Sequence, residues 1–271
     1  MPRVDVCIEA VFEDLPLVER AKRVRDAGFD AIEFWFYDMG GEDRGIPALG
    51  KFCAENGILI NNAVVNAPDA SIGGSLVDPD DRPKYIARLK ETIKICKDIN
   101  CHAAITCTGN CLPGVSLYAQ KRSVIDTLKA AAEVAEAEDF QLFLEALNTR
   151  VDHHGYFLWS AEEGADIVRQ VGSPKVKLLF DIYHMQIMGG NIIERIRELI
   201  DVIGHFHSAG VPGRHDLDIG ELNYPNILRA IDETGYKGLF GLEYWPAGDQ
   251  MESLKRMRQL TLSTQSGQPR C

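Results

Sequence analysis

The sequence predicts a single (β/α)₈ barrel, an α/β fold in which eight parallel strands alternate with helices around a closed sheet. Eight short apolar runs alternate with amphipathic segments along the 271 residues. One strand and one helix therefore take about 34 residues together, the usual length of a βα repeat. Eight repeats close into a barrel more naturally than they form an open sheet. We expect one domain over residues 1–262 and a polar tail over residues 263–271.

The first half of the chain begins directly with a strand-like run and continues with three more. Gly28 and Gly57 stand just before the second and third runs, where glycine suits the left-handed position at a helix end. Residues 82–99 and 116–137 carry apolar side chains three or four positions apart, which predicts amphipathic helices around the fourth run. The four expected strands are VDVCIEA (4–10), AIEFWF (31–36), ILINNAVV (58–65) and HAAITCTG (102–109).

The second half repeats the alternation, and Gly235 again precedes a strand-like run. These runs differ from the earlier ones because each carries an acidic or imidazole side chain near its trailing end. The four expected strands are FQLFLEA (140–146), VKLLFDI (176–182), VIGHFHS (202–208) and LFGLEYW (239–245).

Several classes of protein are disfavoured. An open dinucleotide-binding sheet needs a glycine-rich turn after its first strand, but residues 10–14 read AVFED, so we expect no nucleotide cofactor. The net charge of −11 argues against a nucleic-acid or anionic-membrane surface, which needs clustered Lys and Arg. No run of 18 apolar residues could span a bilayer.

The seven cysteines include no CxxC pair, and several lie inside apolar segments, where a reduced cysteine behaves as a small hydrophobic residue. We therefore expect free thiols in a reducing compartment. The first residues do not resemble a secretory signal. Together these observations predict a cytoplasmic protein.

Glu145, Asp181, His207 and Glu243 are the four polar groups at the ends of the last four runs, at spacings of 36, 26 and 36 residues. A lone buried carboxylate is costly to desolvate, so such groups are normally paired or bound to a metal. Active sites of (β/α)₈ barrels lie where the strands end, and neighbouring strands are roughly 4.8 Å apart. The pattern therefore predicts that the four side chains bind one divalent ion.

Three carboxylates and one imidazole form a hard donor set, suited to Mn²⁺ or Mg²⁺ and able to accept Co²⁺. Four protein ligands leave two octahedral positions for the carbonyl and hydroxyl oxygens of a substrate. A metal there would polarise the carbonyl and acidify the adjacent C–H bond. We assign Glu145 and Glu243 as the acid and base that move the proton.

Four segments carry a family resemblance: LEALNTRVDHHGYFL (144–158), LLFDIYHMQIMGGN (178–191), IGHFHSAGVPGRHDLDIGELNYPNIL (203–228) and GYKGLFGLEYWP (235–246). Together they resemble the hydroxypyruvate isomerase family of xylose-isomerase-like barrels, which are related to the ketose 3-epimerases. The resemblance covers nearly the whole chain and is densest from residue 140 to residue 246. It implies the same barrel and an isomerase that acts through an enediolate.

The resemblance also implies roles for individual residues. Glu145 and Glu243 would be a catalytic pair that touches the metal, Asp181 and His207 would complete the coordination, and His184 and Arg214 would contact the substrate. Hydroxypyruvate isomerases often carry Gln at the position of His207, whereas the ketose epimerases carry His. The substrate therefore stays open between hydroxypyruvate, which would become tartronate semialdehyde, and a free ketose epimerised at C3.

Two further classes are weaker alternatives. A DNA-repair endonuclease of the same superfamily would need extra histidines on the third and fourth strands, and the segment at 58–65 has none. A non-catalytic sugar-binding barrel would not need two opposed glutamates. We expect a small-molecule substrate and, by analogy with related barrels, a homodimer or homotetramer.

Overall fold

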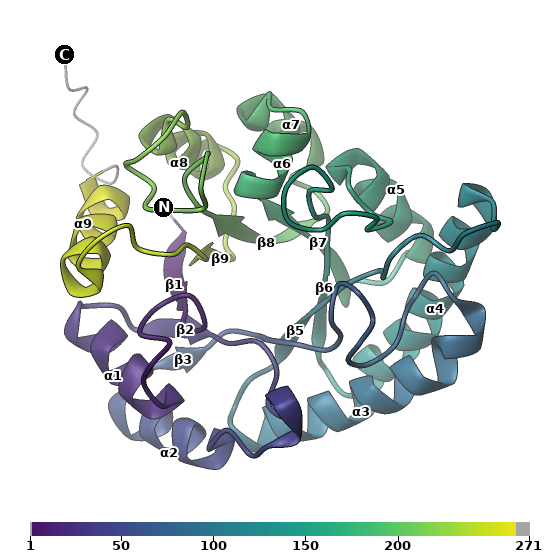
Figure 1. Cartoon of the computed structure of the whole chain (residues 1–271), viewed down its shortest axis with the longest axis horizontal. Coiled ribbons are helices and arrows are strands. Elements are labelled where there is room, and N and C mark those ends of the chain that lie inside the picture. The colour runs from purple at the N-terminus through teal and green to yellow at the C-terminus, as the bar shows by residue number, and fades with distance from the viewer. Residues whose placement is uncertain (1, 264–271) are drawn as a thin grey trace.

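Strand β1 (Arg3–Cys7) is hydrogen-bonded to a parallel strand on each side, β2 (Ala31–Glu33) and β9 (Leu239–Leu242). The computed structural model, which describes residues 2–263, continues parallel pairing in the order β3-β2-β1-β9-β8-β7-β6-β5-β4. Because β3 (Leu59–Ile60) and β4 (Ala63–Val64) are consecutive parts of one barrel position, the sheet closes. Figure 1 shows this ring of strands with helices around its outside. The predicted (β/α)₈ barrel is confirmed.

Each of the eight predicted runs overlaps an observed strand, and the two predicted helices are observed as α3 and α4. The remaining strands are β5 (Ala103–Thr106), β6 (Gln141–Glu145), β7 (Val176–Asp181) and β8 (Ile203–Ser208). The α-helices are α1 (Leu17–Asp26), α2 (Ile46–Asn56), α3 (Arg82–Asp98), α4 (Leu117–Ala137), α5 (Ala161–Val171), α6 (Ile182–Met188), α7 (Ile192–Leu199), α8 (Tyr224–Glu233) and α9 (Gln250–Ser263).

The third barrel position departs from the continuous strand predicted over residues 58–65. It is interrupted at Asn61 and Asn62, whose side chains turn toward acids on β1 and β2. Nδ2 of Asn61 donates to Oδ2 of Asp5 at 2.6 Å, and Nδ2 of Asn62 donates to Oε2 of Glu33 at 2.7 Å. Buried carboxylates need hydrogen-bond donors. The pairing of the third strand with its neighbours is interrupted at the two residues whose side-chain amides are these donors.

Glycine ends the helices as predicted. Gly28, Gly57 and Gly235 have φ values of +98°, +66° and +77°, which a residue without a Cβ adopts at little cost. Gly190 and Asn191 also have positive φ values and separate α6 from α7, so two helices connect β7 to β8.

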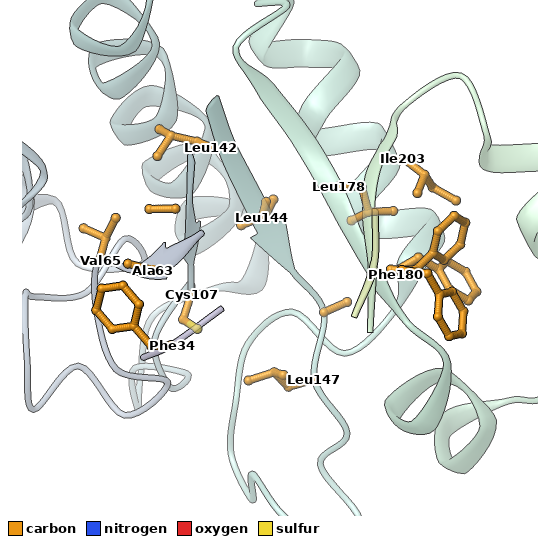
Figure 2. Packing of buried hydrophobic residues seen from close by; sticks show 14 of the residues in the cluster. Phe34, Ala63, Val65, Cys107, Leu142, Leu144, Leu147, Leu178, Phe180 and Ile203 are labelled. Atoms are coloured by element: carbon orange, nitrogen blue, oxygen red, sulfur yellow. The ribbon is translucent and has the colours of Figure 1, made fainter. Parts of the chain in front are cut away.

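The main apolar core lies between the sheet and the surrounding helices. Figure 2 shows part of it, with Leu142 and Leu144 of β6 and Leu178 and Phe180 of β7 among the side chains. These residues alternate along their strands with others that face the barrel interior. The helices therefore pack on one set of side chains and leave the alternate set to form the interior.

The barrel interior is divided into an apolar half and a polar half. A small apolar cluster, which includes Ile105, Phe143 and Leu179, comes from β4 to β7 and the adjoining loops. Buried polar groups occupy the side formed by β1, β2 and β8: Asp5, Glu33, His205 and His207. The ring of Phe143 stacks on that of His205 at a centroid distance of 5.4 Å, where the halves meet.

Glu9 holds together the loops that follow β1 and β2. Its carboxylate contacts Nη1 of Arg20 at 3.1 Å and Nη1 of Arg44 at 2.6 Å, and it accepts a hydrogen bond from the backbone of Trp35. Arg20 also donates to three backbone carbonyl groups, those of Ile8, Glu13 and Leu15. This buried group fixes the backbone that carries Trp35.

Other predictions concern the chain as a whole. The cysteines within residues 2–263 are free thiols, and no helix in this part of the chain could cross a membrane. The predicted tail lies outside the described residues, apart from Ser263, which ends α9. The domain bounds, the cytoplasmic location and the homo-oligomer stay predictions.

Replacing Arg20 by Met should lower the free energy of unfolding by about 3 kcal/mol or more, because three carbonyl groups and part of a buried carboxylate lose their donor. Replacing Arg3 by Met removes a half-exposed ion pair with Asp30 and should cost less than about 1 kcal/mol. Urea unfolding followed by circular dichroism measures both. Equal losses in the two variants would contradict the role given to Arg20.

Candidate metal centre

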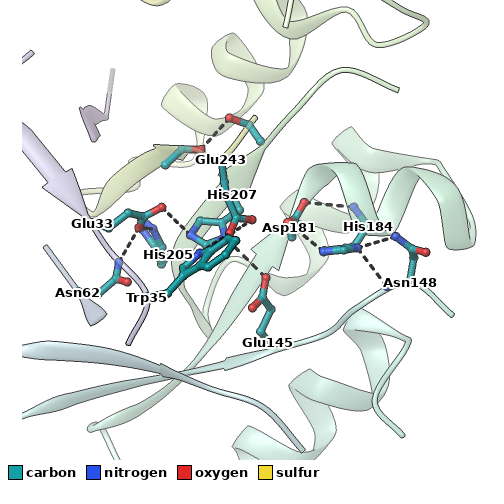
Figure 3. Close-up of polar contacts among 12 residues, drawn as sticks. Glu33, Trp35, Asn62, Glu145, Asn148, Asp181, His184, His205, His207 and Glu243 are labelled. Carbon is teal, nitrogen blue, oxygen red and sulfur yellow. Dashed lines mark hydrogen bonds and ion pairs between the residues drawn. The ribbon is translucent and has the colours of Figure 1, made fainter. Parts of the chain in front are cut away.

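Four side chains with metal-binding groups gather inside the barrel where neighbouring strands end (Figure 3). Glu145 ends β6, Asp181 ends β7, His207 is the penultimate residue of β8, and Glu243 directly follows β9. All four are buried. The structure therefore brings together the whole set of ligands expected from the sequence.

The four groups are close enough to share one ion. One ligand atom from each lies within 4.8 Å of the other three. Nδ1 of His207 lies 3.3 Å from Oε2 of Glu243 and 3.6 Å from Oε1 of Glu145, and it makes no hydrogen bond within residues 2–263. Because buried polar atoms are normally satisfied, this nitrogen between carboxylates fits a bound cation. The donor set suits a hard divalent ion.

Asp181 is also the N-cap of α6. Its Oδ1 accepts a hydrogen bond from the backbone N–H of His184 at 3.1 Å. Its Oδ2 lies 3.5 Å from Nε2 of His184 and 3.9 Å from Nη2 of Arg214. Burial raises the pKa of Asp181 to about 7, although Arg214 and His207 oppose the shift. The helix start thus fixes one oxygen and leaves the other facing the site.

Glu243 is an ionised carboxylate. Burial alone would raise its pKa, but the charges of Arg214 and His207 outweigh burial and lower the pKa to about 2. Nη2 of Arg214 contacts Oε2, and Nε1 of Trp35 donates to Oε1 at 3.2 Å. The pKa of His207 is raised well above its usual value, because Glu33 and Glu243 outweigh the effect of burial.

His184, expected to contact the substrate, is fully buried beside Asp181. Its Nδ1 accepts a hydrogen bond from the backbone N–H of Asn148 at 3.2 Å and lies 2.7 Å from the side-chain Nδ2 of that residue. Burial, aided by the charge of Arg214, lowers the pKa of His184 well below its usual value. The ring is therefore neutral and carries its proton on Nε2, as a donor at the edge of the site.

Arg214, the other expected substrate contact, is held by backbone and aromatic contacts. Its guanidinium lies 5.1 Å from the ring centroids of both Tyr183 and Trp245. The backbone has a φ of +59°, and its N–H donates to the carbonyl of Gly210 while its carbonyl accepts from the N–H of Trp245. This conformation places the guanidinium beside Glu243.

A cavity of about 220 Å³ opens onto the glutamates. Arg214 is the only permanently charged cation among the described residues that line it. One wall is apolar, formed by Trp35, Phe36, Val64, Ile105 and Leu147, and the other is polar, formed by Glu145, His153, His184, Arg214 and Glu243. The cavity can thus place a small polar molecule against the candidate metal ligands.

Some residues of the site had no assignment from the sequence. Glu33 lies in the apolar run 31–36, so like Glu145 it is an acidic residue within a predicted strand. It was not assigned because it does not stand at the end of its run. His205 gave no separate signal, since a buried histidine two positions before His207 is ordinary packing. Asn148 gave none beyond its closeness to Glu145 in the chain.

Comparison with known proteins identifies the family. The family model for xylose isomerase-like TIM barrels matches residues 21–260. A human protein named provisionally as a hydroxypyruvate isomerase is 33% identical over 251 residues, covering 89% of this chain and 88% of that protein. The 2-oxo-tetronate isomerase of Cupriavidus necator is 40% identical over 250 residues, covering 91% of this chain and 94% of that protein.

A solved structure agrees on the fold. The protein from Brucella melitensis described as an AP endonuclease, family 2, superposes with a TM-score of 0.87 at 25% identity, covering 96% of this chain and 99% of that one. The chain therefore belongs to the xylose isomerase-like TIM barrel family, and the resemblance to its hydroxypyruvate isomerases is confirmed.

Proposed function

We propose that this chain is a divalent-metal-dependent isomerase of small 2-oxo acids that carry a hydroxyl group on C3. Hydroxypyruvate, which would become tartronate semialdehyde, is the substrate we favour. The relatives named hydroxypyruvate isomerase and 2-oxo-tetronate isomerase indicate an isomerase. The observation that carries the proposal is the position of Glu145 and Glu243, which share a cluster with Asp181 and His207 and both line the cavity.

The cavity supports a small acidic substrate. Both names given to the relatives describe 2-oxo acids with a neighbouring hydroxyl group, and about 220 Å³ suits a molecule of a few carbon atoms. Arg214 is placed to pair with the substrate carboxylate, since a guanidinium binds carboxylates through two parallel hydrogen bonds. Nε2 of His184 can donate a further hydrogen bond to a substrate oxygen.

The reaction needs a proton removed from C3 of hydroxypyruvate and a proton added to C2, with no net change in oxidation state. A divalent ion held by Glu145, Asp181, His207 and Glu243 supplies a Lewis acid. One of the two glutamates accepts the proton from carbon and the other delivers a proton. Trp35 and Phe36 exclude water from this face of the cavity, so that the carbanion-like intermediate is protected.

A ketose 3-epimerase is the second candidate, because the same ligands and the same glutamate pair would serve it. It would return the proton to the carbon that lost it, on the opposite face. Endonuclease activity, suggested by the description of the Brucella protein, is less well supported. A phosphate backbone needs several cations, whereas only Arg214 lines the described cavity and the net charge is −11.

Metal binding should stabilise the fold. Adding Mn²⁺ to chelator-treated protein at 100 times its dissociation constant should add about 2.7 kcal/mol to the free energy of unfolding.

Asp181→Asn keeps an N-cap for α6 but removes a charged ligand, so its Mn²⁺ affinity should fall at least tenfold. The matched control is Asp78→Asn, at an N-cap away from the site. Calorimetric titration checks both variants, and equal Mn²⁺ affinity in all three proteins would count against the site.

Replacing either Glu145 or Glu243 by Gln should lower kcat by about 100-fold or more at saturating Mn²⁺, because general acid–base catalysis contributes about that much. Circular dichroism should show an unchanged fold. Glu133→Gln, on the exposed face of α4, should keep full activity. Activity within a few fold of wild type in either site variant, with Mn²⁺ bound, would refute the assignment of the pair.

The substrate can be identified by proton exchange. Incubation in deuterated water with hydroxypyruvate, 2-oxo-tetronate and a panel of free ketoses, followed by NMR, reports where deuterium enters. Formation of tartronate semialdehyde with deuterium at C2 is the expected result. Deuterium at C3 of a ketose, with inversion there, would identify an epimerase and overturn the proposed substrate.

A further inference from the structure

We infer that Glu33 is a positioning residue for the metal ligand His207: it holds the proton of the imidazole on Nε2, so that the lone pair of Nδ1 faces the ion. This role goes beyond the proposed function and rests on the metal site proposed there. Glu33 ends β2, on the opposite side of His207 from Glu145 and Glu243 (Figure 3).

The carboxylate of Glu33 and the ring of His207 are in contact in the buried interior of the barrel. Oε1 of Glu33 lies 2.9 Å from Nε2 of His207, and both residues are at most 2% exposed. Within residues 2–263, neither atom makes a hydrogen bond, so the 2.9 Å contact is an ion-pair contact between the carboxylate and the ring nitrogen. Oε1 of Glu33 and Nε2 of His207 are therefore each other's polar partner in this buried region.

The other oxygen of Glu33 is anchored independently. Oε2 accepts a hydrogen bond from Nδ2 of Asn62 at 2.7 Å and lies 3.0 Å from Nε2 of His205. Because Asn62 reaches Glu33 from the interruption between β3 and β4, the third barrel position helps to fix the carboxylate. Glu33 thus presents Oε1 to His207 in one orientation.

Gly241 of β9 leaves just enough room for this arrangement. A Cβ atom at position 241 would lie 2.8 Å from Cδ2 of His207, 3.0 Å from Oε1 of Glu33 and 3.1 Å from Nε2 of His205. The three side chains therefore pack directly against the backbone of Gly241. A side chain at position 241 would therefore displace at least one of these three groups.

The chemistry of imidazole explains the consequence. A neutral ring carries one proton, and a carboxylate beside one nitrogen keeps the proton there. The opposite nitrogen then has a free lone pair, and Nδ1 of His207 is the atom that faces Glu145 and Glu243. A carboxylate behind a metal-binding histidine also raises its basicity, and removing such a partner typically costs 10–100-fold in metal affinity.

The variant Glu33→Gln keeps the size of the side chain and removes its charge. We expect its dissociation constant for Mn²⁺, measured by calorimetry, to rise 10–100-fold. The matched control is Asp5→Asn, which changes another fully buried acid of the same polar half. Oδ2 of Asp5 is bonded to Asn61 and lies 4.0 Å from His205, so its loss should change Mn²⁺ affinity less than threefold.

A second measurement observes the ring of His207 directly, in the wild type and in the two variants. In protein labelled with ¹⁵N-histidine and loaded with diamagnetic Mg²⁺, the signals of His207 should show a proton on Nε2 and none on Nδ1. Because a bound ion alone would leave Nδ1 unprotonated, the signal that reports on Glu33 is that of the Nε2 proton. This signal should move in Glu33→Gln and stay unchanged in Asp5→Asn, whereas a merely structural Glu33 would leave it unchanged in both variants. The signals are assigned by their loss in His207→Gln.

Each outcome bears on a different statement. A wild type that binds neither Mn²⁺ nor Mg²⁺ would overturn the metal site and the role of Glu33 with it. Wild-type binding together with unchanged affinity in Glu33→Gln, or a proton on Nδ1, would overturn the role of Glu33 alone. Equal losses in Glu33→Gln and Asp5→Asn would attribute the effect to buried charge in general and also overturn it.

Discussion

The structure depends on keeping five acidic side chains out of water inside one barrel. Asp5, Glu33, Glu145, Asp181 and Glu243 are all buried, and a buried carboxylate without a partner is strongly destabilising. Cations and amides from other strands and loops meet this requirement. The arginine at 214, the histidines of β8 and the asparagines of the third barrel position each contact at least one of the acids.

The division of the interior separates two tasks. The apolar half, around Phe143 and Leu179, packs as an ordinary core and stiffens β4 to β7. The polar half connects β2 to β8 through Glu33 and His205, and β1 joins them through Asp5, which lies 4.0 Å from His205. Because the ligand positions come from β6 to β9, they span the boundary between the two halves. Rigid packing on one side and a hydrogen-bonded network on the other hold the ligands at fixed distances.

Much of the architecture could be predicted from the sequence because its signals are local. The apolar runs, the glycines at helix ends and the three acids and one histidine near the ends of the last four runs are each recognised from a few neighbouring residues. The interruption at Asn61 could not be predicted, since it depends on an acid 56 residues away. For the same reason no role could be assigned to Asn148 from the sequence, although its backbone N–H donates to Nδ1 of His184 across 36 residues.

Of the three carboxylates in the cluster of Glu145, Asp181, His207 and Glu243, two have an oxygen already occupied. Asp181 uses Oδ1 to begin α6, and Glu243 accepts a hydrogen bond from Trp35 on Oε1. The carboxylate of Glu145 is held, among the described residues, by the 3.6 Å contact with His207. Glu145 is consequently the acid of the cluster whose carboxylate is free to turn, whereas Asp181 and Glu243 are each fixed through one oxygen. Any rearrangement of the cluster when a small molecule enters the cavity would therefore fall first on Glu145, at the end of β6.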